Sequence, residues 1–300
     1  MRVVAALLSY PPHRFIGSEL MTHSLLRRLV QRGHEVVVTG RKIPESGEWE
    51  GVTVSTGPLP AGDVAVYHSD YWQPVAGFQG PTVGVCHNSH IGVQLGLFNN
   101  PPSLVTVNSE AMSAELGIPA VVVHPPVPKI DPISGDCVGL INLERDSKVG
   151  PFWEVAKAMK PQKFLGVRGG YGRQAVPRYV PVNVAVFPTV APQRMRDEVW
   201  SRVRVLMVPS ATESWSMVAT EAMAHGIPVV AHPLPGLLEN LQYAGLWADR
   251  MEPKQWVERL TEAFDRWDEL STASLNRAAE LSELHEAEAE AWCDAVEALI

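Results

Sequence analysis

The chain has 300 residues, of which 46% are hydrophobic and 19% are charged, and its formal net charge is −8. This length suffices for two compact domains with separate cores, and the composition excludes a disordered or fibrous protein. No apolar run approaches the roughly 18 residues that cross a bilayer, so we expect no membrane span. Three scattered cysteines, Cys86, Cys137 and Cys293, show neither a disulfide pattern nor metal-ligand spacing, which favours a reducing, cytoplasmic location.

Charge is distributed unevenly along the sequence. Residues 157–204 contain ten basic and two acidic residues, whereas residues 252–300 contain thirteen acidic and four basic ones. A basic stretch can contact an anionic ligand, and an acidic stretch is typical of a solvated face. We therefore consider an anionic partner for residues 157–204 and expect a solvent-exposed face in the C-terminal segment.

The first forty residues alternate between strand and helix patterns. Arg2–Leu8 is a short apolar run that we interpret as a first strand and not as a secretion signal. Ser18 is a favourable N-cap for a helix with an apolar stripe over residues 21–30, and Gly33 ends that helix. His34–Thr39 resumes as a strand. Strand, helix and strand in succession predict a parallel sheet.

The same alternation continues through both halves of the chain. Short apolar runs predict further buried strands at residues 63–68, 81–86, 104–107, 120–123, 137–141, 164–167, 182–187, 205–209 and 227–231. Helices are predicted at residues 152–159, 217–224, 255–267 and 275–299. The proline-rich segment 124–132 interrupts the pattern and is predicted to be a linker. Two parallel α/β sheets joined by a linker predict two Rossmann-like domains with a cleft between them.

The strongest functional pattern lies between Pro209 and Ala231. A strand ends at Pro209, a polar loop carries Glu213, and Ser216 is placed to cap a helix that contains Glu221. Free N–H groups at a helix start attract anions, and carboxylates accept hydrogen bonds from hydroxyl groups. The pattern therefore suits an anionic, polyhydroxylated ligand, although its spacing alone also fits a plain βαβ turn with two surface glutamates.

Glu213 and Glu221 resemble the E-x7-E motif of the retaining GT-B glycosyltransferases of family four, which include sucrose synthase and mannosyltransferases. The flanking patterns PS-x-x-E and EAM-A-x-G-x-PVVA agree with that family as well. The resemblance implies an α/β GT-B fold, in which two Rossmann-like domains face each other across a cleft. Residues 1–130 would form the acceptor domain and residues 131–280 the donor domain, with the helix at 281–300 packing back on the first domain.

The resemblance also implies roles for the residues of the motif. Glu221 would bind the ribose hydroxyls, and Glu213 would bind the hexose hydroxyls and act in catalysis. The donor would also contact Ser214 and the backbone N–H groups of Trp215, Ser216 and Met217. The family usually has Phe-Gly where this chain has Trp215-Ser216, so the shape of the sugar pocket is expected to differ. Gly236 and Glu239 match a turn that forms one wall of the donor site.

Two loops of the first domain add to the resemblance. Ile16-Gly17-Ser18-Glu19 is similar to the family's Gly-Gly-Ser-Glu loop, which implies that Gly17 allows the backbone to approach a phosphate. A simple strand-to-helix turn would explain the same residues. His87 matches a family histidine beside the donor sugar and is expected to be catalytic, although a histidine at a strand end is often only structural.

The loop after residues 137–141 is expected to hold the diphosphate. Lys148 matches the family's lysine at that position and would stabilise the departing nucleotide diphosphate. The family often has arginine near 141–142, where this chain has Ile141-Asn142. Asn142 would still contact the donor, and either Arg145 or Arg168 would supply the missing charge.

The resemblance implies transfer of a hexose from a nucleotide diphosphate sugar, such as a UDP-sugar, to an acceptor hydroxyl with retention of configuration. No metal and no cofactor beyond the donor would be required. The acceptor is not identified by the sequence, but one candidate is a hydroxymethylated base in phage DNA, contacted by arginines of residues 157–204. Two alternatives stay open, which are a nucleotide-sugar 2-epimerase on the same fold and a non-catalytic module that binds nucleotide sugars.

Overall fold

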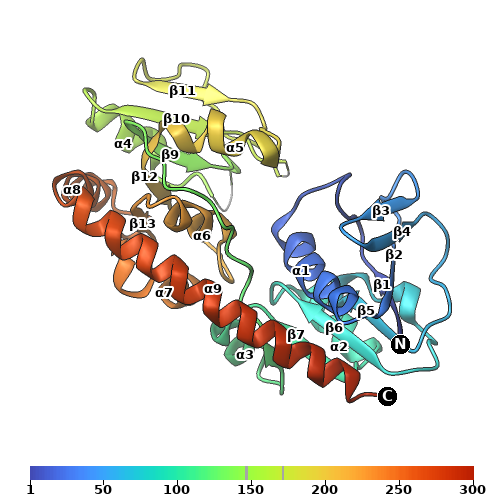
Figure 1. Cartoon of the computed structure of the whole chain (residues 1–300). Helices are drawn as coiled ribbons and strands as arrows, with labels where there is room; N and C mark the ends of the chain where they lie inside the picture. Colours follow the sequence, from blue (N-terminus) through green and yellow to red (C-terminus); the bar gives the residue numbers. More distant parts are fainter. Residues whose placement is uncertain (146–147, 171) are drawn as a thin grey trace. The chain divides into compact units, whose positions relative to one another are not determined.

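The computed structural model of the chain describes residues 1–145, 148–170 and 172–300 (Figure 1). By its internal contacts, the chain divides into two compact units. Unit 1 combines Met1–Pro126 with Glu283–Ile300, and unit 2 is Val127–Ser282. Each unit contains one sheet of predominantly parallel strands. The prediction of an α/β chain with two Rossmann-like domains is therefore confirmed.

Unit 1 is built on an eight-stranded sheet with the order β3-β4-β2-β1-β5-β6-β7-β8, in which only β3 is antiparallel to its neighbour. The central strands are mostly apolar and almost fully buried, as is typical of parallel sheets that are covered on both faces. The strands are β1 (Arg2–Ala6), β2 (Glu35–Thr39), β3 (Gly47–Trp49), β4 (Val52–Ser55), β5 (Val64–His68), β6 (Thr82–Cys86), β7 (Leu104–Val107) and β8 (Val121–Val122).

Three helices accompany this sheet, namely α1 (Gly17–Gln31), α2 (Ile91–Asn99) and α3 (Glu110–Leu116). Helix α1 begins one residue before the predicted cap, because Ile16 occupies the N-cap position and no side chain caps the helix. The Ser18 hydroxyl instead donates a hydrogen bond of 2.5 Å to the Glu19 carboxylate. The predicted capping role of Ser18 is therefore wrong.

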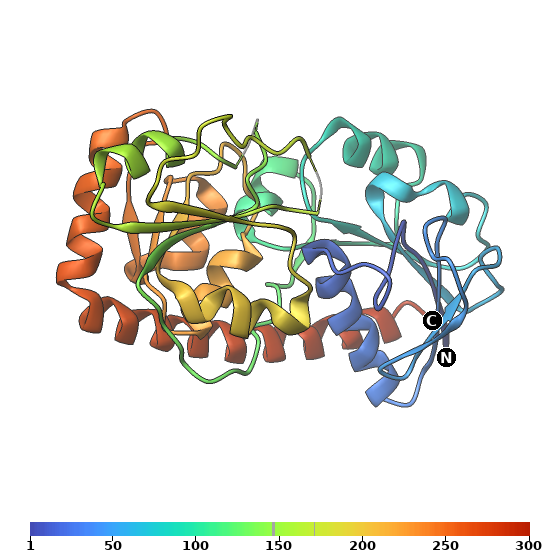
Figure 2. The same ribbon diagram turned by 90° about the horizontal axis from the view of Figure 1, so that it is seen from above.

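The end of the last helix, α9 (Trp267–Glu297), completes the core of unit 1. Trp292 and Val296 are fully buried against apolar residues of α1 and of the sheet. Along its other side α9 forms ion pairs with α1, in which Arg28 contacts Glu290 at 2.8 Å and Arg32 contacts Asp294 at 2.7 Å. The acidic segment is therefore not simply a solvated face. Figure 2 shows α9 as one unbroken helix.

Unit 2 is built on a six-stranded, fully parallel sheet with the order β11-β10-β9-β12-β13-β14. Numbered from the first strand of the unit, this order is 3-2-1-4-5-6, and the direction of winding reverses between β9 and β12. In such sheets ligands bind outside the carboxyl ends of the strands at the reversal. The strands are β9 (Cys137–Ile141), β10 (Lys163–Val167), β11 (Val184–Phe187), β12 (Val203–Val208), β13 (Val229–Ala231) and β14 (Gly245–Trp247).

The helices of unit 2 pack on both faces of this sheet around two apolar clusters. They are α4 (Phe152–Ala158), α5 (Pro192–Glu198), α6 (Met217–Ala224), α7 (Pro235–Leu241), α8 (Pro253–Asp265) and the first part of α9. Helix α9 begins at Trp267, directly after α8 and eight residues earlier than predicted. Within the described residues, no helix is both long and apolar enough to span a membrane.

Candidate functional site

The two strands at the reversal in unit 2 end in loops that carry two oppositely charged side chains. Lys148 lies in the loop after β9, and Glu213 lies in the loop after β12. The Lys148 ammonium forms an ion pair with the Glu213 carboxylate, and these side chains are only 18% and 14% exposed. The same ammonium lies 3.4 Å from the Ser210 hydroxyl and 3.4 Å from the Thr212 carbonyl oxygen. The predicted cation and one predicted carboxylate thus lie together at the carboxyl edge of the sheet, beside the reversal.

Glu221, the second carboxylate of the motif, lies on α6 and is half-buried. Burial raises the pKa of Glu221 to about 7. Across the described part of the chain, no donor forms a hydrogen bond or ion pair with its carboxylate. A desolvated carboxylate without donors gains free energy when ligand hydroxyls reach it. The geometry therefore suits the predicted contact of Glu221 with a polyhydroxylated ligand.

Trp215 and Ser216 lie directly before α6, where the resembling family usually has Phe-Gly. The Trp215 ring is buried in the core of unit 2, and its Nε1–H donates a hydrogen bond of 3.1 Å to the Thr220 hydroxyl. Ser216 has a φ of +79°, in the left-handed region that favours the glycine usual at this position. Ser216 occupies the N-cap position of α6, but its hydroxyl forms no capping bond and is buried without a partner in the described structure. The capping bond expected from Ser216 is therefore wrong.

Asn240, on α7, holds this loop in place and was missed by the sequence analysis. Its side-chain amide donates hydrogen bonds to the carbonyl oxygens of Trp215 at 2.8 Å and Ser216 at 3.1 Å. The guanidinium of Arg277, on α9, in turn donates to the Asn240 carbonyl oxygen at 2.9 Å. The only sequence signal was a polar residue three positions after the buried Leu237, on the same helix face.

Asn142 and the neighbouring arginines lie at the ends of β9 and β10. Asn142 is buried with a φ of +71°, and its side-chain oxygen accepts a hydrogen bond of 3.2 Å from the Gln174 amide. Its side-chain nitrogen has no partner among the described residues. Arg145 and Arg168 are exposed at the same edge of the sheet. Both N–H donors of the Asn142 amide are thus buried without a partner in the described structure, and either arginine can add positive charge at this edge.

The predicted residues of unit 1 also lie at the carboxyl ends of its strands. Gly17 opens α1 after β1, and Glu19 is buried, accepting hydrogen bonds from the hydroxyls of Ser9 at 2.6 Å and Ser18 at 2.5 Å. His87 follows β6, and its ring packs edge-on against His68 with 4.6 Å between ring centroids. Burial lowers the pKa of His68 to about 4 and holds the pKa of His87 well below its usual value. Both rings are therefore neutral at pH 7.

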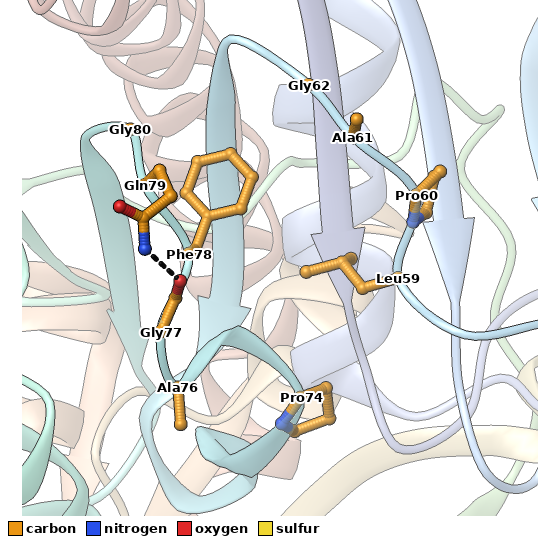
Figure 3. Close-up of a pocket in the computed structure, with 10 residues that line it drawn as sticks. All are labelled: Leu59, Pro60, Ala61, Gly62, Pro74, Ala76, Gly77, Phe78, Gln79 and Gly80. Atoms are coloured by element: carbon orange, nitrogen blue, oxygen red, sulfur yellow. Dashed lines mark hydrogen bonds between the residues drawn. The ribbon is translucent and has the colours of Figure 1, made fainter.

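A pocket of about 380 Å³ lies at the opposite edge of the same sheet (Figure 3). It is lined by residues that precede β5 and β6, namely Leu59, Pro60, Ala61, Gly62, Pro74, Ala76, Gly77, Phe78, Gln79 and Gly80. None of them is ionisable, and the Gln79 amide donates to the Gly77 carbonyl oxygen at 2.7 Å. The pocket is thus separate from the predicted residues. In the part of the chain that the structure describes, no three His, Cys, Asp or Glu side chains are grouped to hold a metal ion.

Comparisons with known proteins point to one family. Residues 155–266 match the model of the family described as glycosyl transferases group 1. The D-inositol 3-phosphate glycosyltransferase of Segniliparus rotundus is 29% identical over 177 residues, which cover 55% of this chain and 36% of that protein. Its counterpart in Thermobispora bispora is 34% identical over 86 residues, which cover 28% of this chain and 20% of that protein. The chain therefore spans only about a fifth to a third of these relatives.

Solved structures match over nearly the whole chain. Sucrose-phosphate synthase from Thermosynechococcus elongatus has a TM-score of 0.76 at 15% identity and covers 100% of this chain and 99% of its own. Anabaena HepE, in complex with UDP-glucose, has a TM-score of 0.74 at 16% identity and covers 98% of this chain and 100% of its own. At such identities the likeness concerns the fold. The chain therefore has the GT-B fold of these structures, and its segment 155–266 matches the family model of the group 1 glycosyl transferases.

Proposed function

We propose that this chain is a glycosyltransferase that takes a hexose from a nucleotide diphosphate sugar and transfers it to an acceptor hydroxyl with retention of configuration. The observation that carries the proposal is the ion pair of Lys148 and Glu213 at the winding reversal of unit 2. Eight residues after Glu213, the carboxylate of Glu221 has no partner among the described residues. A UDP-sugar is the favoured donor, because the structurally similar Anabaena protein is described in complex with UDP-glucose.

In this proposal each group has a chemical task that its position permits. Lys148 and the free N–H groups at the start of α6, from Ser216 and Met217, neutralise charge that develops on the diphosphate. Glu213 accepts hydrogen bonds from hexose hydroxyls, and Glu221 accepts them from ribose hydroxyls. Because cationic and N–H groups do this work, no metal ion is needed. For His87 and Gly17, in unit 1, we keep the roles that the sequence resemblance implies.

Donor binding and turnover test this proposal directly. Calorimetric titration with UDP-glucose and related nucleotide sugars should show binding that Glu221→Gln weakens by about tenfold or more. With a mixture of sugar acceptors, nuclear magnetic resonance (NMR) of the product gives the anomeric configuration. An inverted product contradicts retention, and conversion of the donor alone to an epimer supports the 2-epimerase alternative. Binding without hydrolysis or transfer supports the non-catalytic module.

The basic stretch, residues 157–204, is the part of the chain that would contact DNA if a base in DNA were the acceptor. Arg194 pairs with Glu198, and Arg196 pairs with Asp197 at 3.2 Å. The guanidinium of Arg204 stacks on the Trp267 ring at 3.4 Å. A stacked guanidinium keeps its charge, and most of the ten basic residues of this stretch form no ion pair in the part of the chain that the structure describes. Retention of the protein on hydroxymethylated DNA at low salt, lost as salt rises, would support DNA as the acceptor.

A cytoplasmic location is part of the same proposal. Cys86 and Cys293 are buried free thiols, and Cys137 is a half-buried one. Nucleotide sugars are also substrates that an enzyme of the cytoplasm can reach directly. Fractionation of the native host, with detection of the chain by antibody, tests the location.

A further inference from the structure

We propose that the turn before β11 is a docking surface for a lipid bilayer that carries anionic headgroups. The surface consists of Tyr179, Val180 and Val182 in the turn, with the cations of Lys157 and Arg178 beside them. The turn leads into β11, the edge strand of the unit 2 sheet (Figure 1). The inference goes beyond the proposed function and does not depend on it, because the turn lies at the amino edge of the sheet and the donor would bind at the carboxyl edge.

The turn exposes several apolar side chains in succession. Residues 179–182 have the sequence Tyr-Val-Pro-Val, and the side chains of Tyr179 and Val182 are 78% and 105% exposed. Val180 is exposed as well. In the described part of unit 2, the other exposed large apolar residues are not adjacent to one another in sequence; they are Leu238, Tyr243 and Met251. A run of exposed apolar residues is unfavourable in water and usually marks a contact surface.

Hydrogen bonds of the backbone and of Asn183 hold the turn in place. A backbone hydrogen bond of 2.9 Å closes a β-turn over residues 181–184, with Val182 at its first corner. The Asn183 side-chain amide donates to the carbonyl oxygens of Ala156 and Gln162, at 2.9 Å each. The turn is thus fixed against the end of α4 without the apolar side chains, which are left to project into solvent from a rigid base.

The surroundings of the turn are basic. Residues 157–182 contain six basic residues and no acidic one. Lys157 lies in the last turn of α4, next to the carbonyl group that Asn183 binds. The Arg178 guanidinium lies 5.4 Å from the centre of the Tyr179 ring. Lys157 and Arg178 are both exposed, and neither forms an ion pair within the described residues.

The nearest carboxylates of α4 and β9 leave this positive charge in place. Asp136, directly before β9, already pairs with Lys163 at 2.5 Å, and Glu154 lies in the first turn of α4, at the opposite end from Lys157. The net charge of the chain is −8. At physiological salt, however, exposed charges are largely screened beyond about 8 Å, so the local charge decides what the turn attracts.

Exposed apolar side chains beside cations match the surface of an anionic bilayer. Val182 and the Tyr179 ring gain free energy when they enter the boundary between headgroups and acyl chains, where tyrosine is enriched in proteins. Lysine and arginine remain at the headgroup phosphates. DNA would attract the cations but offers no apolar environment for Val182. A second copy of the chain would need about 800 Å² of matching surface, which a protruding turn does not supply.

Co-sedimentation of the whole protein with vesicles tests the proposal. The wild type should bind vesicles of phosphatidylcholine with about 30% phosphatidylserine, bind less as salt rises, and bind phosphatidylcholine alone weakly. The double variant Tyr179→Ser/Val182→Ser should bind the anionic vesicles about tenfold more weakly. Lys157→Ala/Arg178→Ala should also lose about tenfold or more. Phe98→Ser, which removes an exposed apolar side chain from α2, is the matched control and should bind as the wild type does.

Four results overturn the proposal. The first is a wild type that does not bind anionic vesicles, and the second is full binding by Tyr179→Ser/Val182→Ser. Loss of binding in Phe98→Ser would place the membrane contact on α2. A turn that instead mediates DNA binding or self-association, measured by electrophoretic mobility shift and light scattering of the same variants, would replace the bilayer by another partner. None of these measurements uses the donor, so a failure of the proposed function would leave them unchanged.

Discussion

The Lys148 ammonium and the Glu213 carboxylate form an ion pair that joins the loop after β9 to the loop after β12. The two loops flank the winding reversal of the unit 2 sheet, where an anionic ligand is expected. The pair keeps a largely buried cation and anion compensated before a ligand binds. A bound diphosphate would compete with Glu213 for Lys148 and leave Glu213 available to sugar hydroxyls.

Replacement of Lys148 should therefore affect turnover more than folding. Lys148→Met removes the charge that would stabilise the departing diphosphate, and we expect kcat/KM for transfer to fall by about 100-fold to 1,000-fold. Calorimetry should show weaker binding of UDP. Lys160→Met, at an exposed lysine of the same unit, is the matched control and should behave as wild type. A loss below about twofold for Lys148→Met would contradict the assigned role.

The raised pKa of Glu221 predicts a stability effect with a definite sign. Its pKa in the folded protein is about 7, above the ordinary value of 4.5. The folded state therefore holds this proton more tightly than the unfolded chain does, and the contribution of Glu221 to stability falls as pH rises from about 4.5 to about 7. Glu221→Gln stays neutral, so it should be more stable than wild type at pH 8, by about 1–3 kcal/mol, and nearly equal at pH 4.

Melting temperatures at several pH values check this prediction. Glu258→Gln, at an exposed position of α8, should show no such pH-dependent difference from wild type. Glu221→Gln should weaken donor binding even though it raises the stability of the free protein at pH 8. The reason is that one of the two carboxylate oxygens that we propose to accept from ribose hydroxyls becomes an NH2 group. A Glu221→Gln variant that is less stable than wild type at pH 8 would show that the ionised carboxylate has a favourable partner.

Gly236 contacts the Glu213–Ser214 backbone so closely that no side chain fits between them. A Cβ at position 236 would lie 2.2 Å from the Ser214 carbonyl oxygen and 2.9 Å from that of Glu213. Helix propensity alone predicts that alanine at this position of α7 would stabilise the protein. The close contact makes the same substitution destabilising instead. Gly236→Ala should displace the loop, weaken donor binding by about tenfold or more and destabilise the protein by about 1–3 kcal/mol.

The matched control for this change is Gly47→Ala, because a Cβ at position 47 meets no atom within 4 Å. Donor titration and thermal unfolding of both variants separate the local effect from a general cost of replacing glycine. Equal donor affinity in Gly236→Ala and wild type would mean that the loop adjusts without moving Glu213. Gly236 would then have no role in donor binding.

The sequence analysis predicted the strands that carry the site, because their apolar runs are continuous and end at turn residues. It missed elements without such patterns. Helix α2 has no polar face, since Ile91, Leu95 and Phe98 are exposed apolar residues on it, and α7 begins with Pro-Gly. The short edge strand β3 offers only three residues. In these segments tertiary contacts decide the structure more than local preference does.

The carboxylates of the site were predictable because one short motif carries both of them. The residues that hold the site were not predictable, because long-range packing brings them together. His68 and Thr22 are 46 residues apart and meet only because β1 pairs with β5. Asn240 reaches Trp215 across 25 residues through the packing of α7 on α6. No local pattern in a single sequence encodes these contacts.

The stability of unit 1 is expected to depend on the end of α9, which is distant in sequence from the rest of the unit. Trp292 is fully buried in the unit 1 core, and its Nε1–H donates a hydrogen bond of 2.8 Å to the Thr106 hydroxyl on β7. Trp292→Ala should destabilise unit 1 by about 3–5 kcal/mol through the cavity it leaves. Trp292→Phe keeps most of the ring volume and should cost about 1–2 kcal/mol, mainly through the lost hydrogen bond.

Urea unfolding followed by circular dichroism measures the loss of stability in both variants. The control is Ile300→Ala, at an exposed position, which is expected within about 0.5 kcal/mol of wild type. Equal midpoints for Trp292→Ala and wild type would mean that burial of this ring in the unit 1 core contributes little to stability.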